Sequence, residues 1–439
     1  MYSKQAYEIF LSATRAVQPQ LLLPEYIYSK NGFLHLTNQE FNIRDINRFI
    51  VIAAGKAAPG MANVTEKQVG ILISKGYCIT KYGHSLPLEY FHTIEAAHPV
   101  PDQNSIKAVE IVLQAVNGLN VDDIVLVLLS GGASSLLADI PEGCTLEETK
   151  NIFKMLINSG ASIHEINIVR KHLSKIKGGQ LAKAVYPAKL FTLIISDVVG
   201  DHLESIASGP TVSDSSTFED AYRILQKYNI WTSTAESVRK YILKGVNQTI
   251  EDTPKPGAHF FYNTTTKIIG SNNLALNMAK QKAEQFGYHS FILTDNLTGN
   301  ADTEARKFVH YLQHYSGEKP VCILMGGETT LKVTSPGKGG RNQHFVLSAI
   351  NELLKNSISG TDHDITILSA GTDGTDGPTD AAGALFNNKS LPAFMGMNEM
   401  IQEHLDRFDS YSYFYKMGGL VITGPTQTNV MDIVVALIH

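Results

Sequence analysis

The 439-residue chain is poor in cysteine, has a single tryptophan and contains no long apolar segment. Its cysteines, Cys78, Cys144 and Cys322, are scattered and odd in number, so they predict neither a disulfide framework nor a zinc site. We therefore expect a reducing, cytoplasmic setting. Apolar runs such as Ile124–Leu129 are far shorter than the roughly 18 residues that a membrane span needs. The first residues lack a basic segment followed by an apolar one, so no signal peptide is expected.

A basic excess is missing as well. The formal net charge of −5 argues against a nucleic-acid-binding surface, which normally carries an excess of lysine and arginine. The hydrophobic content of 43% and the charged content of 18% are typical of a well-packed protein. A chain of this length can hold two or three domains of about 100–200 residues each. The expected partners are small molecules, with no nucleic acid and no membrane, and both a monomer and a homodimer are left open.

Two nucleotide-binding fingerprints are absent. A P-loop needs a lysine followed by serine or threonine, but Lys56 is followed by Ala57, and Ile50 stands where the motif needs its first glycine. The pattern Gly-x-Gly-x-x-Gly, typical of dinucleotide-binding folds, does not occur. The first absence excludes the P-loop class, and the second counts against a dinucleotide-binding function.

Short apolar runs alternate with amphipathic stretches along the chain. The predicted strands span residues 49–53, 70–73, 124–129, 191–195, 267–269, 290–293, 321–325 and 365–368. The predicted helices span residues 7–17, 103–118, 146–159, 177–185 and 274–286. Such alternation is typical of parallel sheets covered by helices on both faces. We therefore predict an α/β fold with two domains, each a largely parallel sheet flanked by helices.

A polar stretch that contains prolines, residues 245–257, marks the expected boundary between the domains. We place this boundary near residue 250, which gives an N-terminal domain of residues 1–250 and a C-terminal domain of residues 251–439. The amphipathic helix within residues 1–22 could pack on either domain.

Five of the predicted strands end in a distinctive polar loop, at residues 54–58, 130–135, 196–201, 326–330 and 369–383. Because ligands bind beyond the carboxyl ends of strands in open α/β sheets, these loops are expected to carry the site. The last loop holds Asp373, Asp376 and Asp380 among four glycines. Crowded carboxylates repel one another, so a metal ion or a cationic ligand is the usual reason for such a loop. The alternative is structural, since aspartate and glycine are ordinary turn formers.

Three further features predict the binding of anionic groups. The first is the loop that holds Ser130, Gly131, Gly132 and Ser134. Its amides and a following helix N-terminus can cradle an anion, although a tight turn would use the same residues. The second is Lys56, which follows a strand and could neutralise phosphate, unless it is an ordinary surface lysine. The third is Arg341 in a glycine-rich loop, whose planar guanidinium suits a carboxylate or phosphate, unless the loop is a simple hairpin.

Several segments occur in an order that points to one family. They are residues 53–57, 130–132, 167–174, 177–179, 197–201, 206–211, 326–328, 339–343, 371–374, 423–426 and 428–430. With these segments the chain resembles the glycerate 2-kinase family, whose C-terminal part is called the MOFRL domain. The likeness runs from about residue 49 to the C-terminus, with the MOFRL-like region at about 320–435. The ordered array is specific, whereas any one of its members would not be.

The resemblance implies ATP-dependent phosphorylation of D-glycerate at its 2-hydroxyl, giving 2-phosphoglycerate and ADP with Mg²⁺. It also implies a Rossmann-like N-terminal domain and an active site in the cleft between two α/β domains. By motif, Lys56 and Arg341 resemble the catalytic basic residues, and Asp197 and Asp373 resemble functional carboxylates. The residues expected to bind substrate or phosphate are Ser130, Gly131, Gly132, Ser134, Arg170, Glu328 and Asn342. The expected Mg²⁺ ligands are Asp373 and Asp376.

Two residues depart from the family pattern, and two other functions stay open. Ala133 stands where many members have a third glycine, and His344 stands where an acidic residue is common. One alternative function is a hydroxypyruvate reductase, against which the missing dinucleotide motif counts. The other is a non-catalytic protein that binds a small hydroxy acid, against which Lys56, Arg341 and the aspartate loop count.

Overall fold

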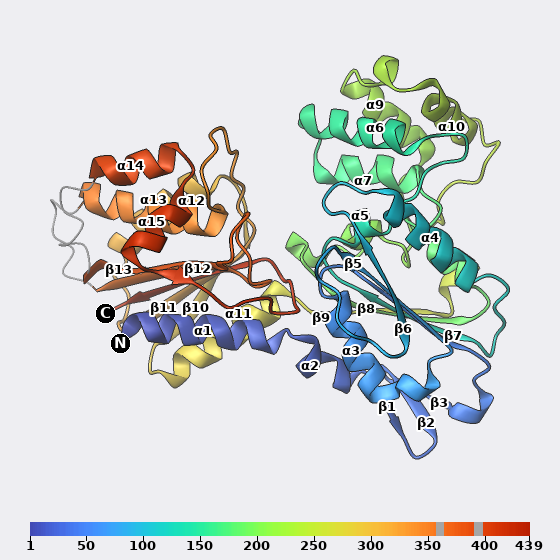
Figure 1. The fold of residues 1–439 in the computed structure, drawn as a ribbon, viewed down its shortest axis with the longest axis horizontal. Coiled ribbons are helices and arrows are strands. Elements are labelled where there is room, and N and C mark those ends of the chain that lie inside the picture. The colour runs from blue at the N-terminus through green and yellow to red at the C-terminus, as the bar shows by residue number, and fades with distance from the viewer. Residues whose placement is uncertain (357–363, 390–397) are drawn as a thin grey trace. The chain divides into compact units, whose positions relative to one another are not determined.

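The structure is a computed structural model that describes residues 1–356, 364–389 and 398–439 (Figure 1). Its contacts divide the chain into two units. The first unit holds Leu22–Ile269, and the second holds Met1–Leu21 together with Gly270–His439. The division falls later than the expected position near residue 250, because strand β9 (Thr264–Gly270) completes the sheet of the first unit.

The first unit is built on a six-stranded sheet with the order β6-β5-β4-β7-β8-β9. The registered pairs among β4 to β8 are parallel, which confirms the α/β prediction for this part of the chain. Strands β4 (Phe49–Ala54) and β7 (Ile124–Leu129) are buried along their whole length, as expected of central strands with both faces covered. The remaining strands are β5 (Lys75–Lys81), β6 (Phe91–Ala96) and β8 (Lys189–Ile195).

The strand predicted at residues 70–73 is wrong. Gly70–Leu72 forms a single 3-10 turn at the end of helix α3 (Ala58–Val69), and Ile71 is 88% exposed. The real strand, β5, begins at Lys75 and alternates polar and apolar residues at its start. The short apolar run was therefore the end of a helix, and the lysines at both ends of β5 concealed the strand.

Two groups of helices accompany this sheet. Helices α3, α4 (Gln103–Ala115), α5 (Ala133–Leu136) and α8 (Gln180–Val185) contact its strands. Helices α6 (Leu146–Asn158), α7 (Ile163–His172), α9 (Phe218–Lys227) and α10 (Glu236–Val246) share a separate apolar core (Figure 1). A small antiparallel sheet adds β1 (Ile27–Lys30), β2 (Phe33–Leu36) and β3 (Gln39–Asn42). Short helical turns complete the unit at Leu23–Glu25, Ile43–Asp45, Val199–Asp201, Ile206–Ser208, Trp231–Ser233 and His259–Phe261, and a further turn, Pro19–Leu22, spans the division between the units.

The second unit contains a mixed sheet with the order β10-β11-β15-β12-β13-β14. Among its described pairs, β10 (His289–Leu297) with β11 (Val321–Gly327) is parallel and the other four are antiparallel. The prediction of a largely parallel sheet is therefore wrong for this part of the chain. The physical reason is β15 (Asp432–Ile438), which enters between β11 and β12 (Ile365–Gly371) in the opposite direction. The edge is formed by β13 (Gly383–Asn387) and β14 (Leu420–Val421).

Helices cover both faces of the mixed sheet (Figure 1). On one face lie α1 (Tyr2–Ala16) and α11 (Asn272–Gln285), so the N-terminal helix belongs to the second unit. On the other face lie α12 (Ala301–Gln313), α13 (Arg341–Asn356), α14 (Asn398–Asp406) and α15 (Ser410–Met417). None of the described helices has both the length and the apolar character needed to cross a membrane.

Candidate active site

The loops that follow the neighbouring strands β4 and β7 are locked together. Gly55 has a φ of +128°, and a Cβ atom on it would lie 2.2 Å from the Ser130 Oγ atom. The Ser130 hydroxyl accepts a hydrogen bond from the Ala57 amide at 3.0 Å. The Lys56 amide donates to the Gly131 carbonyl at 2.8 Å. The parallel register of the two strands therefore places Lys56 beside the predicted anion loop.

Gly132 gives this loop its sharp bend. Its φ is +86°, in the left-handed region, and a Cβ atom would lie 3.0 Å from the His98 ring. Ala133, which replaces a family glycine, begins helix α5 with a negative φ and needs no glycine. Because α5 is a single turn, its terminus adds less positive charge than the sequence led us to expect.

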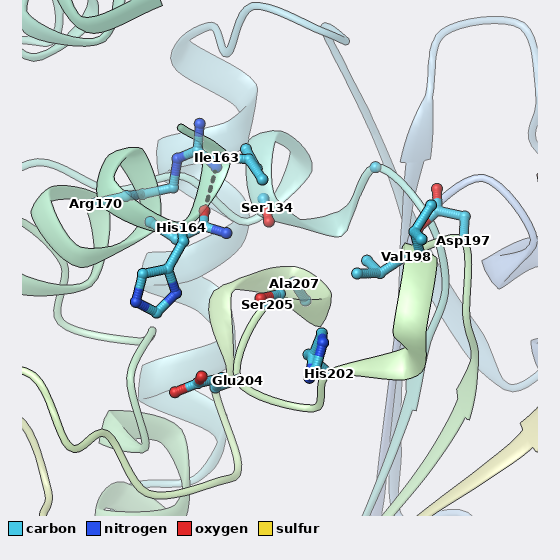
Figure 2. A pocket seen from close by; sticks show the side chains of 14 residues that line it. Ser134, Ile163, His164, Arg170, Asp197, Val198, His202, Glu204, Ser205 and Ala207 are labelled. Atoms are coloured by element: carbon cyan, nitrogen blue, oxygen red, sulfur yellow. Dashed lines mark hydrogen bonds between the residues drawn. The ribbon is translucent and has the colours of Figure 1, made fainter. Parts of the chain in front are cut away.

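Helix α7 directs polar side chains into a cavity of about 550 Å³, which we call the Arg170–Asp197 cavity. Ser162 and Glu165 form a capping box that fixes where the helix begins. His164, Asn167 and Arg170 follow at intervals of three residues, so they share one face of the helix and line the cavity (Figure 2).

A chain of hydrogen bonds ties the anion loop to this helix. The Ser134 and Ser208 hydroxyls lie 3.1 Å apart, and the Ser208 hydroxyl donates to the Asn167 Oδ1 atom at 3.3 Å. The Arg170 guanidinium donates to the same Asn167 oxygen at 2.8 Å. Asn167 and Ser208 thereby hold Ser134 and Arg170 in a fixed relation at the cavity wall.

Arg170 is a cation that has no carboxylate partner in the described part of the chain. Burial lowers the pKa of its guanidinium, which nevertheless stays far above neutral. Its polar partner is Asn167, and the Phe153 ring lies 5.2 Å away; no salt bridge to Arg170 exists within the described residues. A buried cation that lacks an anion is a favourable place for an anionic ligand.

Asp197 follows strand β8 and supplies a carboxylate to the same cavity. In Figure 2, Asp197 and Arg170 lie on opposite sides of the labelled residues, with Ser134 between them. The next loop also lines the cavity and contains Asp201 and Ala207, whose φ angles are both 53°. Such left-handed backbone costs roughly 1–2 kcal/mol at a residue other than glycine. Strain of this kind is often concentrated at functional sites.

A second cavity, of about 850 Å³, shares Gly132, Ser134 and Arg170 with the first. We call it the Phe153 cavity, after the aromatic side chain on its wall. Lys177 also lines it and is 2% exposed. Burial, together with the positive charge of Arg170, lowers the pKa of Lys177 to about 8.

In the second unit, Arg341 lies at the start of α13 between two carboxylates. Its Nε and Nη2 atoms donate to the two Asp432 oxygens at 2.6 and 2.9 Å. Its Nη1 atom lies 2.8 Å from a Glu328 oxygen. Burial opposes the charge of Arg341, but Asp432 and Glu328 outweigh it and raise the pKa of the guanidinium above its usual range. Asp432 reaches this position because β15 pairs it with Gly327 and Gly371, at the carboxyl ends of β11 and β12.

Asp376 caps the start of the same helix. It is 2% exposed and accepts hydrogen bonds from the Asn342 and Gln343 amides at 3.1 and 2.8 Å. Burial raises the pKa of Asp376 to about 6, against the effect of these two amides. His344 on α13 is buried, which lowers its pKa to about 4, so the imidazole adds no charge near neutral pH.

Asp373, in the same loop, is less buried than Asp376. It accepts hydrogen bonds from the Thr375 amide and hydroxyl at 3.0 and 3.1 Å. A Cβ atom on Gly371 would lie 3.4 Å from an Asp373 oxygen and 3.3 Å from an Asp432 oxygen, so both carboxylates border the same small space. The described residues contain no group of three or more metal-ligating side chains. Mg²⁺ commonly takes one or two carboxylates and completes its shell with substrate phosphates and water.

Comparison with known proteins places the chain. Residues 5–243 match the model of a domain of unknown function, DUF4147, and residues 321–432 match the MOFRL family. The D-glycerate 2-kinase of Thermotoga maritima is 42% identical over 99% of this chain and 98% of its own. This chain belongs to the glycerate 2-kinase family. The crystal structure of glycerate kinase from Thermotoga maritima superposes with a TM-score of 0.84 at 40% identity, covering 100% of this chain and 99% of that one.

Relatives of this glycerate 2-kinase family member carry more than one name. The glycerate 2-kinase of Pyrococcus horikoshii is 39% identical over 97% of this chain and 95% of its own. A protein of Agrobacterium vitis named putative hydroxypyruvate reductase is 40% identical over 90% of this chain and 88% of its own. The family of this chain is therefore established, although the named relatives within it carry different activity names.

The structure brings most of the predicted site residues of this family member into two groups. Of the predicted site residues, those that line the Arg170–Asp197 cavity are Gly131, Gly132, Ser134, Arg170 and Asp197. Lys56 lies beside their loop, whereas Ser130 is 1% exposed and holds the chain of the neighbouring loop. The second group lies beyond β11 and β12 and consists of Glu328, Arg341, Asn342, Asp373 and Asp376.

Sequence reasoning missed three polar residues of these groups. Asn167 and Ser208 lay in quoted family segments, and the three-residue spacing from Asn167 to Arg170 was a usable signal. Asp432 was missed because it precedes an apolar run, residues 433–438, that was not recognised as a strand. An aspartate that begins a buried central strand is the signal that would have found it.

Proposed function

We propose that this protein is a glycerate 2-kinase that transfers the γ-phosphoryl group of ATP to the 2-hydroxyl of D-glycerate. The relatives named above support this proposal through their identity over nearly the whole chain. One structural observation supports it most directly. Arg170, a cation without a carboxylate partner among the described residues, lines the same cavity as the Asp197 carboxylate, with Ser134 between them (Figure 2). A short hydroxy acid offers the matching groups, a carboxylate at one end and a hydroxyl next to it.

The two ends of D-glycerate would bind different side chains. Its carboxylate would accept hydrogen bonds from the Arg170 guanidinium and the Ser134 hydroxyl, which Asn167 and Ser208 already hold in place. Its 2-hydroxyl would donate to Asp197. The cavity volume of about 550 Å³ also leaves room for the phosphoryl group that is transferred.

In the reaction, the 2-hydroxyl oxygen forms a bond to the γ-phosphorus as the bond from that phosphorus to the β–γ bridging oxygen breaks. ADP leaves with that bridging oxygen, and Asp197 takes the hydroxyl proton. The protein contributes chiefly alignment and positive charge, because the transferring phosphoryl group spreads charge over its outer oxygens. Lys56 and Arg341 would supply this charge, as the family resemblance implies. That these two cations act on one shared nucleotide, in a cleft between the units, stays a prediction from the sequence.

Asp373 is the side chain that we propose for Mg²⁺. Its carboxylate is less buried than that of Asp376, and it borders the same space as Asp432. Asp376 was predicted as a second ligand, but its two oxygens already accept the amides of α13, so we propose a positioning role for it. When bound, Mg²⁺ would offset the negative charge of the ATP phosphates.

Product analysis tests the proposed reaction. The purified protein, ATP, Mg²⁺ and D-glycerate should give ADP and a phosphorus NMR signal of 2-phosphoglycerate, and 3-phosphoglycerate should be absent. A product phosphorylated at the 3-position, or ADP release that does not depend on glycerate, would contradict the proposal.

The hydroxypyruvate reductase name of the Agrobacterium vitis relative defines the second candidate. It is tested in the same preparation by following nicotinamide absorbance with hydroxypyruvate. We expect no oxidation of NADH or NADPH. Rapid oxidation, with no transfer of phosphate to glycerate, would favour the reductase. Sedimentation of the purified chain would decide between a monomer and a homodimer.

A further inference from the structure

The Phe153 cavity is larger than D-glycerate requires and adjoins the proposed glycerate site. Its volume of about 850 Å³ lies within the range of roughly 300–1,000 Å³ that small-molecule sites occupy. It shares Gly132, Ser134 and Arg170 with the Arg170–Asp197 cavity, so one ligand group at these residues would be within reach of both. The cavity lies entirely within the first unit, whose residues are all described.

The walls of the Phe153 cavity differ in chemistry from those of its neighbour. Apolar side chains come from two separate segments, the loop after β6 and helix α6. They are Pro99, Val100, Pro101, Leu146, Phe153 and Ile157. These residues offer surfaces against which a flat ring can pack, whereas glycerate has no apolar portion to bury there.

The shared end of the cavity carries excess positive charge. Arg170 and Lys177 both line the cavity, and burial lowers the pKa of each side chain. The carboxylate nearest to Lys177 is Asp139 at 3.8 Å, and it already accepts hydrogen bonds from the Ser174 hydroxyl and the Lys175 amide. The positive charges of Arg170 and Lys177 thus have one carboxylate nearby, and both oxygens of that carboxylate already accept hydrogen bonds. An anionic ligand would therefore stabilise this end of the cavity.

We propose that the Phe153 cavity is the nucleotide subsite, with the purine and ribose against its apolar walls and the phosphates at Gly132, Lys177 and those donors of Arg170 that the glycerate carboxylate does not use. The assignment rests on the proposed kinase function, which requires ATP. A nucleotide combines a flat, weakly polar ring with a multiply charged end, and the cavity offers the same two surfaces in the same order. The γ-phosphate would then reach the edge of the Arg170–Asp197 cavity, next to the glycerate hydroxyl.

The test fills the cavity instead of emptying it, because a cavity-filling change at an exposed side chain preserves the core. Val100 is 57% exposed and Ile157 is 61% exposed, and they stand on the two separate walls. The variants are Val100→Trp and Ile157→Trp. Phe33→Trp, at a side chain 40% exposed in the β1–β3 sheet that lines neither cavity, is the matched control.

Calorimetric titration of each variant with ATP and with inorganic tripolyphosphate separates the base from the phosphates. Both cavity variants should raise the dissociation constant of ATP about tenfold, the size of a lost base-packing contact. The dissociation constant of tripolyphosphate and the KM for glycerate should stay within about twofold, as should all values for the control.

Each other outcome overturns the assignment. ATP affinity unchanged in both variants would exclude the nucleotide from this cavity, as would wild-type protein that binds tripolyphosphate as tightly as ATP. A raised KM for glycerate with unchanged ATP affinity would make the cavity part of the acceptor site. Titration needs no turnover, so a failure of the proposed glycerate reaction is seen separately in the product analysis and does not decide this result.

Discussion

Replacing Asp432 with asparagine tests whether one carboxylate positions the cation of the second unit. Asp432 is 3% exposed and holds the Nε and Nη2 atoms of Arg341 at 2.6 and 2.9 Å. Asparagine has nearly the same shape but offers one acceptor instead of two and carries no charge. The D432N variant should therefore keep the fold but hold the Arg341 guanidinium less firmly in place.

The size of the effect follows from the contacts that remain. Loss of a hydrogen bond to a charged group costs about 1.5–3 kcal/mol. Arg341 keeps Glu328 at 2.8 Å and is 32% exposed, so the loss of stability should fall at the lower end, about 2 kcal/mol. A catalytic group displaced by about 1 Å can lose 10²-fold in rate, so we expect kcat to fall about 10–100-fold.

The measurement is kcat and KM for both substrates, with denaturant unfolding as the stability readout. D364N is the matched control, since Asp364 pairs with Lys389 at 2.7 Å in the same unit and should leave kcat unchanged. A double-mutant cycle with R341A adds the decisive comparison. If Asp432 acts through Arg341, D432N should cause no further loss in the R341A background. Additive losses, or a D432N enzyme with the kcat of the wild type, would refute this role.

Four further changes have defined outcomes. G55A should lower the free energy of unfolding by about 3 kcal/mol or more in a denaturant titration, because its Cβ would lie 2.2 Å from Ser130 Oγ; an unchanged midpoint would contradict the packing described. K56A should lower kcat about 10²–10³-fold with an unchanged melting temperature, and near-normal turnover would remove this lysine from the mechanism. The pKa of Lys177 falls from 10.5 to about 8 on folding, so between these pH values the unfolded chain binds more protons than the folded chain. The free energy of unfolding should therefore rise from pH 8 to pH 10, and K177M should flatten this rise. An equal rise in both proteins would show that another group causes it. The pKa of Asp376 rises from 3.8 to about 6 on folding, so its stabilising contribution should be present below pH 3.8 and lost as the pH passes 6; D376N should abolish this dependence in unfolding experiments between pH 4 and pH 7.

The parallel sheet of the first unit was predictable because its central strands are continuous apolar runs. Ile124–Leu129 is buried at every position, and such a run has few alternatives to a strand covered on both faces. The anion loop was also predictable. Gly132 adopts a left-handed backbone, which favours glycine, and its loop lies where two neighbouring strands end. These features depend on residues that are close together in the sequence.

The mixed sheet of the second unit was not predictable in the same way. The direction of β15 is set by pairing with β11 and β12, which lie far away in the sequence. Neither an apolar run nor its length reveals whether a strand enters a sheet parallel or antiparallel. Asp432 was lost for the same reason, because its role depends on partners that only the register brings near.

The strand β15 also has a consequence for how the protein is made. It follows both β11 and β12 in the chain, yet it occupies an inner position between them. Helix α1, which precedes the whole first unit in the chain, packs on this same sheet, and the Tyr2 ring stacks on His439 at 3.6 Å. The first unit can fold while synthesis continues, whereas α1 lacks its complete sheet until β15 has been made. A nascent chain of this protein would therefore need shielding of the apolar face of α1 until β15 has been synthesised.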